Sequence, residues 1–106
     1  MIPEDRAEKA LLYIRDNTER GGQLLGAKIE SENRIKVSKA IEYLAATGTV
    51  DERKSKAEIS PEVKRAVKDY VDSCHAYETF RLEIKAADLT IDIWRSQNAS
   101  NRAKVL

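Results

Sequence analysis

Apolar residues recur at intervals of three and four between Ser60 and about Gln97. The recurring positions are Val63, Val67, Tyr70, Cys74, Tyr77, Phe80, Ile84, Ala87, Ile91 and Trp94. This spacing is typical of one face of an α-helix, because a half-buried strand alternates at every second residue. Ser60 can cap the helix and Pro61 fits its first position. The pattern therefore predicts one long helix over residues 60–97.

A second long helix is predicted over residues 23–47, where the apolar positions gather towards the two ends. Its middle, residues 30–34, is polar, so this segment is either exposed or faces a partner with matching polar groups. Gly48 follows and suits the end of a helix, because glycine adopts a positive φ at low cost.

Two shorter helices are predicted, one over residues 1–17 and one over residues 49–59. Thr49 and Glu52 have the spacing of a capping box, in which each side chain bonds a backbone N–H of the other residue. Asn17-Thr18 followed by Gly21-Gly22 predicts a turn between the first helix and the second. Residues 98–106 are predicted to form a polar, basic tail after the last helix.

Together these elements predict an all-α protein, a single helical domain built as a long, coiled-coil-like antiparallel hairpin. The helix over residues 49–59 would form the tip, and the helix over residues 1–17 would pack at the base, near Trp94. One hairpin leaves two long helices with little to cover them. We therefore expect self-association as a dimer or higher oligomer, with the apolar seam continuing through Tyr70, Tyr77 and Ile84.

The composition supports a narrow helical seam and limits the choice of partner. The 106 residues are 42% hydrophobic, 6% aromatic and 35% charged, with a formal net charge of +1. Near-neutral charge argues against a protein that coats nucleic acid with its whole surface. No apolar run approaches membrane-spanning length, so we expect a cytoplasmic protein without membrane contact. The single cysteine, Cys74, reads as a small buried hydrophobe.

The sequence predicts no catalytic, cofactor-binding or metal site, and we expect a protein that is not an enzyme. His75 follows Cys74 directly, and adjacent helical residues point about 100° apart, which disfavours a nucleophile–base pair. Asp88 and Asp92 are one helical turn apart, a spacing that solvated helix faces produce often.

Two regions are candidates for interaction with other molecules. The charged tip contributes Arg53 and Lys54. The base combines tryptophan and arginine, which are enriched in binding hot spots, with side chains that can contact phosphates and base edges. Its candidate residues are Trp94, Arg95, Gln97, Asn98, Asn101, Arg102 and Lys104.

Four short strings resemble small helical proteins encoded by tailed phages and prophages of Gram-negative bacteria. They are Glu8-Lys9-Ala10-Leu11, Thr49-Val50-Asp51-Glu52-Arg53-Lys54, Tyr77-Glu78 and Ile93-Trp94-Arg95-Ser96-Gln97-Asn98-Ala99-Ser100-Asn101-Arg102. The resemblance spans most of the chain and carries over no catalytic residue. It implies a phage origin, in the host cell cytoplasm, and an association with phage DNA replication or recombination genes.

Two functions follow as expectations. In the first, the chain is a non-catalytic interaction protein that acts as a phage accessory factor, with a host or phage protein as its partner. In the second, it is an accessory protein that binds nucleic acid through the basic tail. Near-neutral charge favours the first, and the Arg and amide side chains of the tail favour the second.

Overall fold

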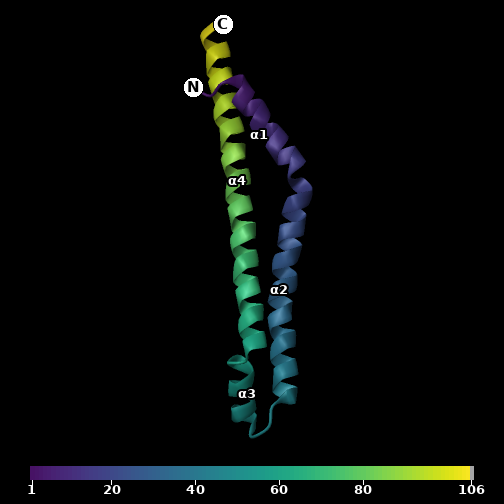
Figure 1. Cartoon of the computed structure of the whole chain (residues 1–106). Helices are drawn as coiled ribbons and strands as arrows, with labels where there is room; N and C mark the ends of the chain where they lie inside the picture. The colour runs from purple at the N-terminus through teal and green to yellow at the C-terminus, as the bar shows by residue number, and fades with distance from the viewer. Residues whose placement is uncertain (106) are drawn as a thin grey trace. The chain divides into compact units, whose positions relative to one another are not determined.

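The computed structural model describes residues 1–105, with side chains up to Lys104, and contains four helices and no strand in that part of the chain (Figure 1). This confirms the predicted all-α class. The helices are α1 (Glu4–Asp16), α2 (Thr18–Ala45), α3 (Val50–Glu58) and α4 (Pro61–Val105).

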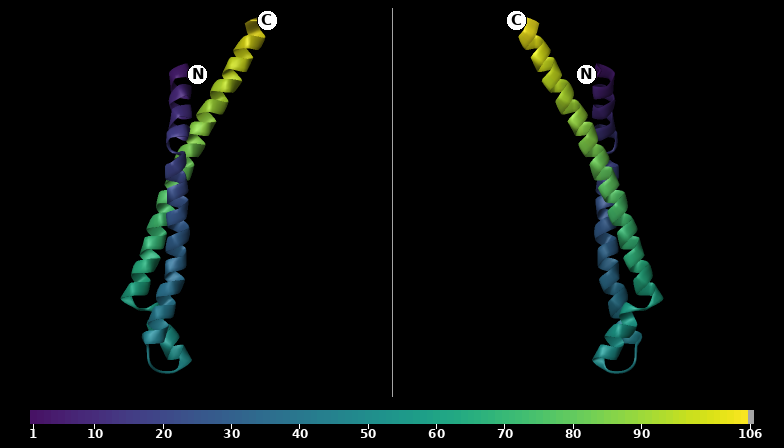
Figure 2. Two further views of the ribbon diagram at one scale, coloured as in Figure 1. Left: turned by 90° about the vertical axis from the view of Figure 1, so that its right-hand side faces the viewer. Right: turned by 90° about the vertical axis from the view of Figure 1, so that its left-hand side faces the viewer.

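The contacts within the chain divide it into two compact units. The tip unit is residues 23–77, and the base unit is residues 1–22 with residues 78–105. In the tip unit α2 runs towards the short helix α3, and α4 returns beside α2 in the opposite direction (Figures 1 and 2). The predicted antiparallel hairpin with a short helix at its tip is therefore confirmed.

In the base unit α1 runs antiparallel to α4. The backbone N–H of Ile2 donates to Oε1 of Gln97 at 2.9 Å, and the Tyr13 hydroxyl donates to the carboxylate of Glu83. Contacts therefore join the start of α1 to the late part of α4, and the end of α1 to the earlier part. This segment of α4 contains Trp94, in agreement with the predicted position of the first helix.

The inner face of α4 follows a strict heptad repeat, which we call the inner seam. Every one of its positions is buried or half-buried: Val63, Ala66, Tyr70, Ser73, Tyr77, Phe80, Ile84, Ala87, Ile91, Trp94 and Asn98. The predicted stripe differs at its second and fourth positions, where the inner seam has Ala66 and Ser73 in place of Val67 and Cys74. Ala66 is 4% exposed, whereas Val67 is 41% exposed. Alternating steps of three and four keep a seam facing its partner, so the smaller residue lies inside.

The polar middle of α2 is divided between the inside and the surface. Ser31 is buried, and its hydroxyl donates to the carbonyl oxygen of Lys28 at 3.0 Å. Glu30 and Arg34 are exposed and form an ion pair at 3.0 Å. A small hydroxyl that bonds its own helix can face α4 without an unsatisfied polar group, while the charges stay in water.

The chain breaks between α1 and α2 at Asn17 alone, so the turn predicted over residues 17–22 is much shorter than expected. The Tyr13 carbonyl accepts both from the Asn17 side chain at 2.8 Å and from the Asn17 backbone N–H at 3.1 Å, so Asn17 closes the end of α1 with two bonds. Gly21 and Gly22 are helical. A Cβ on Gly21 would lie 2.6 Å from Cε1 of Phe80, so the glycine permits a close approach of the aromatic ring.

The predicted helix starts at the tip are confirmed. The Thr49 hydroxyl accepts from the backbone N–H of Glu52 at 3.2 Å, and the Ser60 hydroxyl accepts from that of Val63 at 3.2 Å. Helix α2 ends at Ala45, before the predicted end at residue 47, and Gly48 lies in the connection to α3 with a φ of +116°, which glycine adopts at low cost.

Helix α4 continues to Val105, past the predicted end at Gln97, so the tail is helical as far as it is described. Arg102 and Lys104 lie in its last turns, where positive charge is favoured by the negative end of the helix dipole. This explains why a polar sequence still extends the helix. Leu106, the last residue of the predicted tail, lies outside the described residues.

Candidate interaction surface

Arg53, a candidate at the tip, contacts other residues of the tip unit. Its Nε donates to the Tyr43 carbonyl at 3.2 Å, and its guanidinium carbon lies 4.2 Å from the centroid of the Tyr43 ring. Nearby, Nζ of Lys56 donates to the Thr47 carbonyl at 2.8 Å. Basic side chains of α3 thus donate to one carbonyl in the last turn of α2 and to one just beyond that helix; the Tyr43 carbonyl also accepts from the Ala46 N–H at 3.3 Å. Arg53 therefore holds the tip together.

Lys54 is exposed and lies on an open groove of about 450 Å³ between α2 and α3. Lys39 lines the same groove, together with Ala40, Tyr43, Ala57 and Glu58. The two ammonium groups give the groove local positive charge, and the Glu58 carboxylate offsets part of it.

Three candidates at the base have structural positions. Trp94 and Asn98 occupy the inner seam and are half-buried. Gln97 accepts the hydrogen bond from the backbone N–H of Ile2 and so anchors the start of the chain on α4. The amide of Gln97 is thus already engaged by its own chain.

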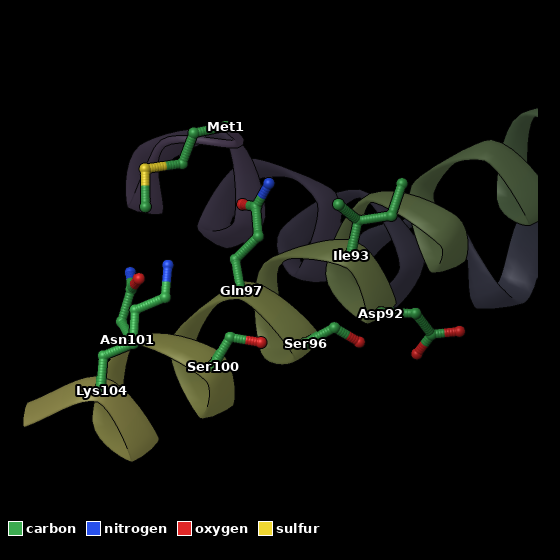
Figure 3. Close-up of a pocket in the computed structure, with 8 residues that line it drawn as sticks. All are labelled: Met1, Asp92, Ile93, Ser96, Gln97, Ser100, Asn101 and Lys104. Atoms are coloured by element: carbon green, nitrogen blue, oxygen red, sulfur yellow. The ribbon is translucent and has the colours of Figure 1, made fainter. Parts of the chain in front are cut away.

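The other four candidates at the base, Arg95, Asn101, Arg102 and Lys104, are exposed. Arg95 and Arg102 are seven residues apart and therefore lie on the same face of α4. Asn101 and Lys104 line an open groove of about 530 Å³ (Figure 3). The groove also contains Met1, Asp92, Ile93, Ser96, Gln97 and Ser100. The structure thus separates the basic residues between an arginine face and a groove that also carries a carboxylate.

Two tyrosines have perturbed acidity. The hydrogen bond to the Glu83 carboxylate raises the pKa of Tyr13, because ionising the phenol would remove the donated proton. The neighbouring Cys74 thiol raises the pKa of Tyr70, with a smaller contribution from the charge of Glu32. Both changes favour the neutral phenol at ordinary pH.

Among residues 1–105, no three His, Cys, Asp or Glu side chains are close enough together to hold a metal ion. His75 is exposed, whereas Cys74 is half-buried. In the same part of the chain, no helix has the length and apolar character needed to cross a membrane.

Sequence reasoning missed the apolar side chains on the outer faces of the helices. Four of the seven buried hydrophobic residues are alanines, whereas many larger aliphatic side chains are exposed. The exposed ones on the two long helices are Leu25, Ile29, Val37, Ile41, Leu44, Val67, Val71, Leu82, Leu89 and Ile93. Several of these also recur at steps of three and four, a signal that the prediction of one stripe per helix did not use.

The residues expected to extend the seam between subunits lie inside the chain. Tyr70, Tyr77 and Ile84 are half-buried on the inner seam of α4. The Lys28 ammonium lies 5.2 Å from the centroid of the Tyr77 ring, a cation–π contact between α2 and α4. These side chains therefore already pack in part within the chain, and their role in self-association stays a prediction.

Comparison with known protein families, curated proteins and solved structures finds no match to this chain. The resemblance to phage-encoded proteins therefore stays a prediction.

Proposed function

We propose that this chain is a non-catalytic helical interaction protein, a cytoplasmic accessory factor of a phage or prophage that acts through protein–protein contacts. The observation that carries the proposal is that large aliphatic side chains are exposed while small apolar side chains are buried. Leu44 is 75% exposed, while the buried hydrophobic residues are mostly alanines. Burial of exposed aliphatic surface is the main driving force of protein association.

The helices that display these side chains are held by specific local contacts. Thr49 and Ser60 cap α3 and α4, and Arg53 donates a hydrogen bond to a carbonyl in the last turn of α2. An interaction surface on well-anchored helices loses little conformational entropy on binding, so that more of the gross contact energy appears as affinity.

Site-specific photo-crosslinking in a Gram-negative host tests this function. A photoreactive residue at exposed Ile41 should form adducts with other proteins, whereas the same residue at exposed Lys36 should form far fewer, because it lies on another face of α2. Equal yields at both positions, or no protein adduct at either, would contradict the proposal.

The alternative function is binding of nucleic acid, favoured by the continuation of α4 into the tail. Arg95 and Arg102 share one helix face, Lys104 follows, and no acid occurs after Asp92. Replacing Arg102 and Lys104 with Ala should weaken DNA binding and reduce its salt slope by about two phosphate contacts. The matched control replaces Lys64 and Arg65, two exposed basic residues of α4 in the tip unit. Absent DNA binding, or an unchanged slope, would eliminate this alternative.

A further inference from the structure

Helix α4 carries a second repeat on the side opposite the inner seam, within the base unit. We call it the outer stripe, and all of its members are uncharged and exposed: Thr79, Leu82, Ala86, Leu89, Ile93, Ser96 and Ser100. Its large residues Leu82, Leu89 and Ile93 are 55%, 52% and 47% exposed. Steps of three and four over this length are the pattern by which one helix packs against another.

We propose that the outer stripe binds the same stripe of a second copy of this chain, as an antiparallel, two-fold symmetric pair of α4 helices. This deepens and rests on the proposed function, because it names one partner of a helical interaction protein. In the proposed alignment Leu82 lies against Ile93 of the second copy, and Ala86 against its Leu89. Two-fold symmetry repeats each pairing in reverse, so one patch serves both copies.

Charge complementarity selects this alignment. Lys85 and Asp92 flank the outer stripe on one side, and both are exposed. Neither has an ion-pair partner among the described residues. In the antiparallel pair, Lys85 of each copy lies beside Asp92 of the other, which gives two equivalent ion pairs at the edge of the interface.

The neighbouring alignments bring like charges together. If one α4 helix shifts by one heptad along the other, the two Lys85 side chains lie side by side. A shift in the opposite direction places the two Asp92 side chains side by side. A parallel pair in register places Glu78 beside Glu83 of the second copy. Like charges at flanking positions of a helix pair are destabilising, so the sequence discriminates against these alternatives.

The other flank of the stripe is covered by the chain itself. There Glu83 accepts the hydrogen bond from Tyr13, and Gln97 accepts that from Ile2, so α1 lies along this side. Figure 3 shows the groove beside it, in which Ile93 and Ser96 are part of the outer stripe. In the proposed pair this groove receives Leu82 and Thr79 of the second copy.

Charge reversal in the full chain tests both the association and its alignment, by sedimentation under reducing conditions that keep Cys74 a thiol. The unmodified chain should form dimers at micromolar concentration. Lys85→Asp alone and Asp92→Lys alone should each weaken the dimer by about tenfold, because both edge pairs become repulsive. An equimolar mixture of the two variants should form heterodimers, and the double variant should recover near-original affinity.

A matched pair of leucine variants tests the face. Leu89→Ser should yield monomers with unchanged helicity by circular dichroism, whereas Leu44→Ser, which removes a more exposed leucine on α2, should leave the dimer intact. The inference is overturned if the unmodified chain is monomeric at about 100 μM, a concentration at which even weak specific pairs assemble. It is also overturned if the double charge variant fails to recover dimers, or if Leu44→Ser dissociates the dimer and Leu89→Ser does not.

These results are distinguishable from failure of the proposed function. A monomeric chain that still forms selective protein adducts at position 41 would overturn the self-pairing alone. A dimer that follows the charge-reversal pattern but gives no adduct with other proteins would support the self-pairing and contradict the role as an accessory factor.

Discussion

The two faces of α4 have the same spacing but different occupants. The inner seam contains the bulky aromatic residues Tyr70, Tyr77, Phe80 and Trp94, and it packs within the chain. The outer stripe combines leucine and isoleucine with Ala, Ser and Thr, and it is exposed. Periodicity therefore locates the faces of α4, while the aromatic residues indicate which face the chain itself covers, because they bury the most apolar area.

The largest expected effect is the difference in unfolding free energy between alanine substitutions on the two faces of α4. Phe80 is buried on the inner seam, so Phe80→Ala should lower the free energy of unfolding by about 3–5 kcal/mol. Leu82→Ala, on the outer stripe two residues later, should cost less than about 1 kcal/mol in the monomer, since its side chain is already largely hydrated. Urea unfolding followed by circular dichroism, at concentrations low enough to avoid association, measures both. Similar losses for the two variants would contradict the assignment of the faces.

A smaller effect is expected from adding one methyl group to neighbouring helical glycines. Gly21→Ala would place its Cβ 2.6 Å from the Phe80 ring and should destabilise the protein by about 1–3 kcal/mol. Gly22→Ala meets no atom within 4 Å and should stabilise it by about 0.5–1 kcal/mol, because alanine favours the helix. Thermal unfolding should therefore shift in opposite directions, and a shared direction would show that the close approach is wrong.

Loss of a helix cap should affect the start of α4 more modestly. Ser60→Ala removes the acceptor for the Val63 N–H and should cost about 1 kcal/mol. Ser55→Ala, at an exposed position inside α3, is the matched control and should be neutral or slightly stabilising. Denaturant midpoints that fall equally for both variants would argue against a specific cap.

The smallest effect concerns the contact between α1 and α4 at high pH. The pKa of Tyr13 is raised in the folded protein, so the neutral phenol contributes stability that is present below the unfolded pKa of about 10. That contribution is lost as the pH rises through the higher folded value. Stability of the native protein should therefore fall more steeply than that of Tyr13→Phe between about pH 9 and 11. Tyr70 titrates in both proteins, so identical pH curves would show that Tyr13 makes no such contribution.

Most of the helices and most of the inner seam could be predicted from the sequence, because spacing and capping are local signals. Thr49 and Ser60 mark the starts of their helices with side-chain chemistry. The continuation of α2 through Gly21 could not be predicted in this way. A helical glycine costs up to about 1 kcal/mol locally, and packing against Phe80, far along the chain, offsets it.

The candidate interaction residues were harder to assign for the same reason. Arg53 and Gln97 read as free polar groups in the sequence, but each bonds a backbone group from another segment. The outer stripe was hidden by its mixture of leucine with serine and threonine. Its meaning depends on which side of α4 is already occupied, and only the folded chain shows that.

The contact between Gly21 and Phe80 also limits how far this part of α2 can shift along α4. If α2 shifted by one helical turn, the aromatic ring would meet a residue that has a side chain, and that side chain would fill the space left by the missing Cβ of Gly21. The phenylalanine ring thus fits only beside the glycine, and at the adjacent axial positions it would clash with a side chain. Repeats of three and four look alike after every turn, so a helix pair built from them needs one irregular position to exclude misaligned packings.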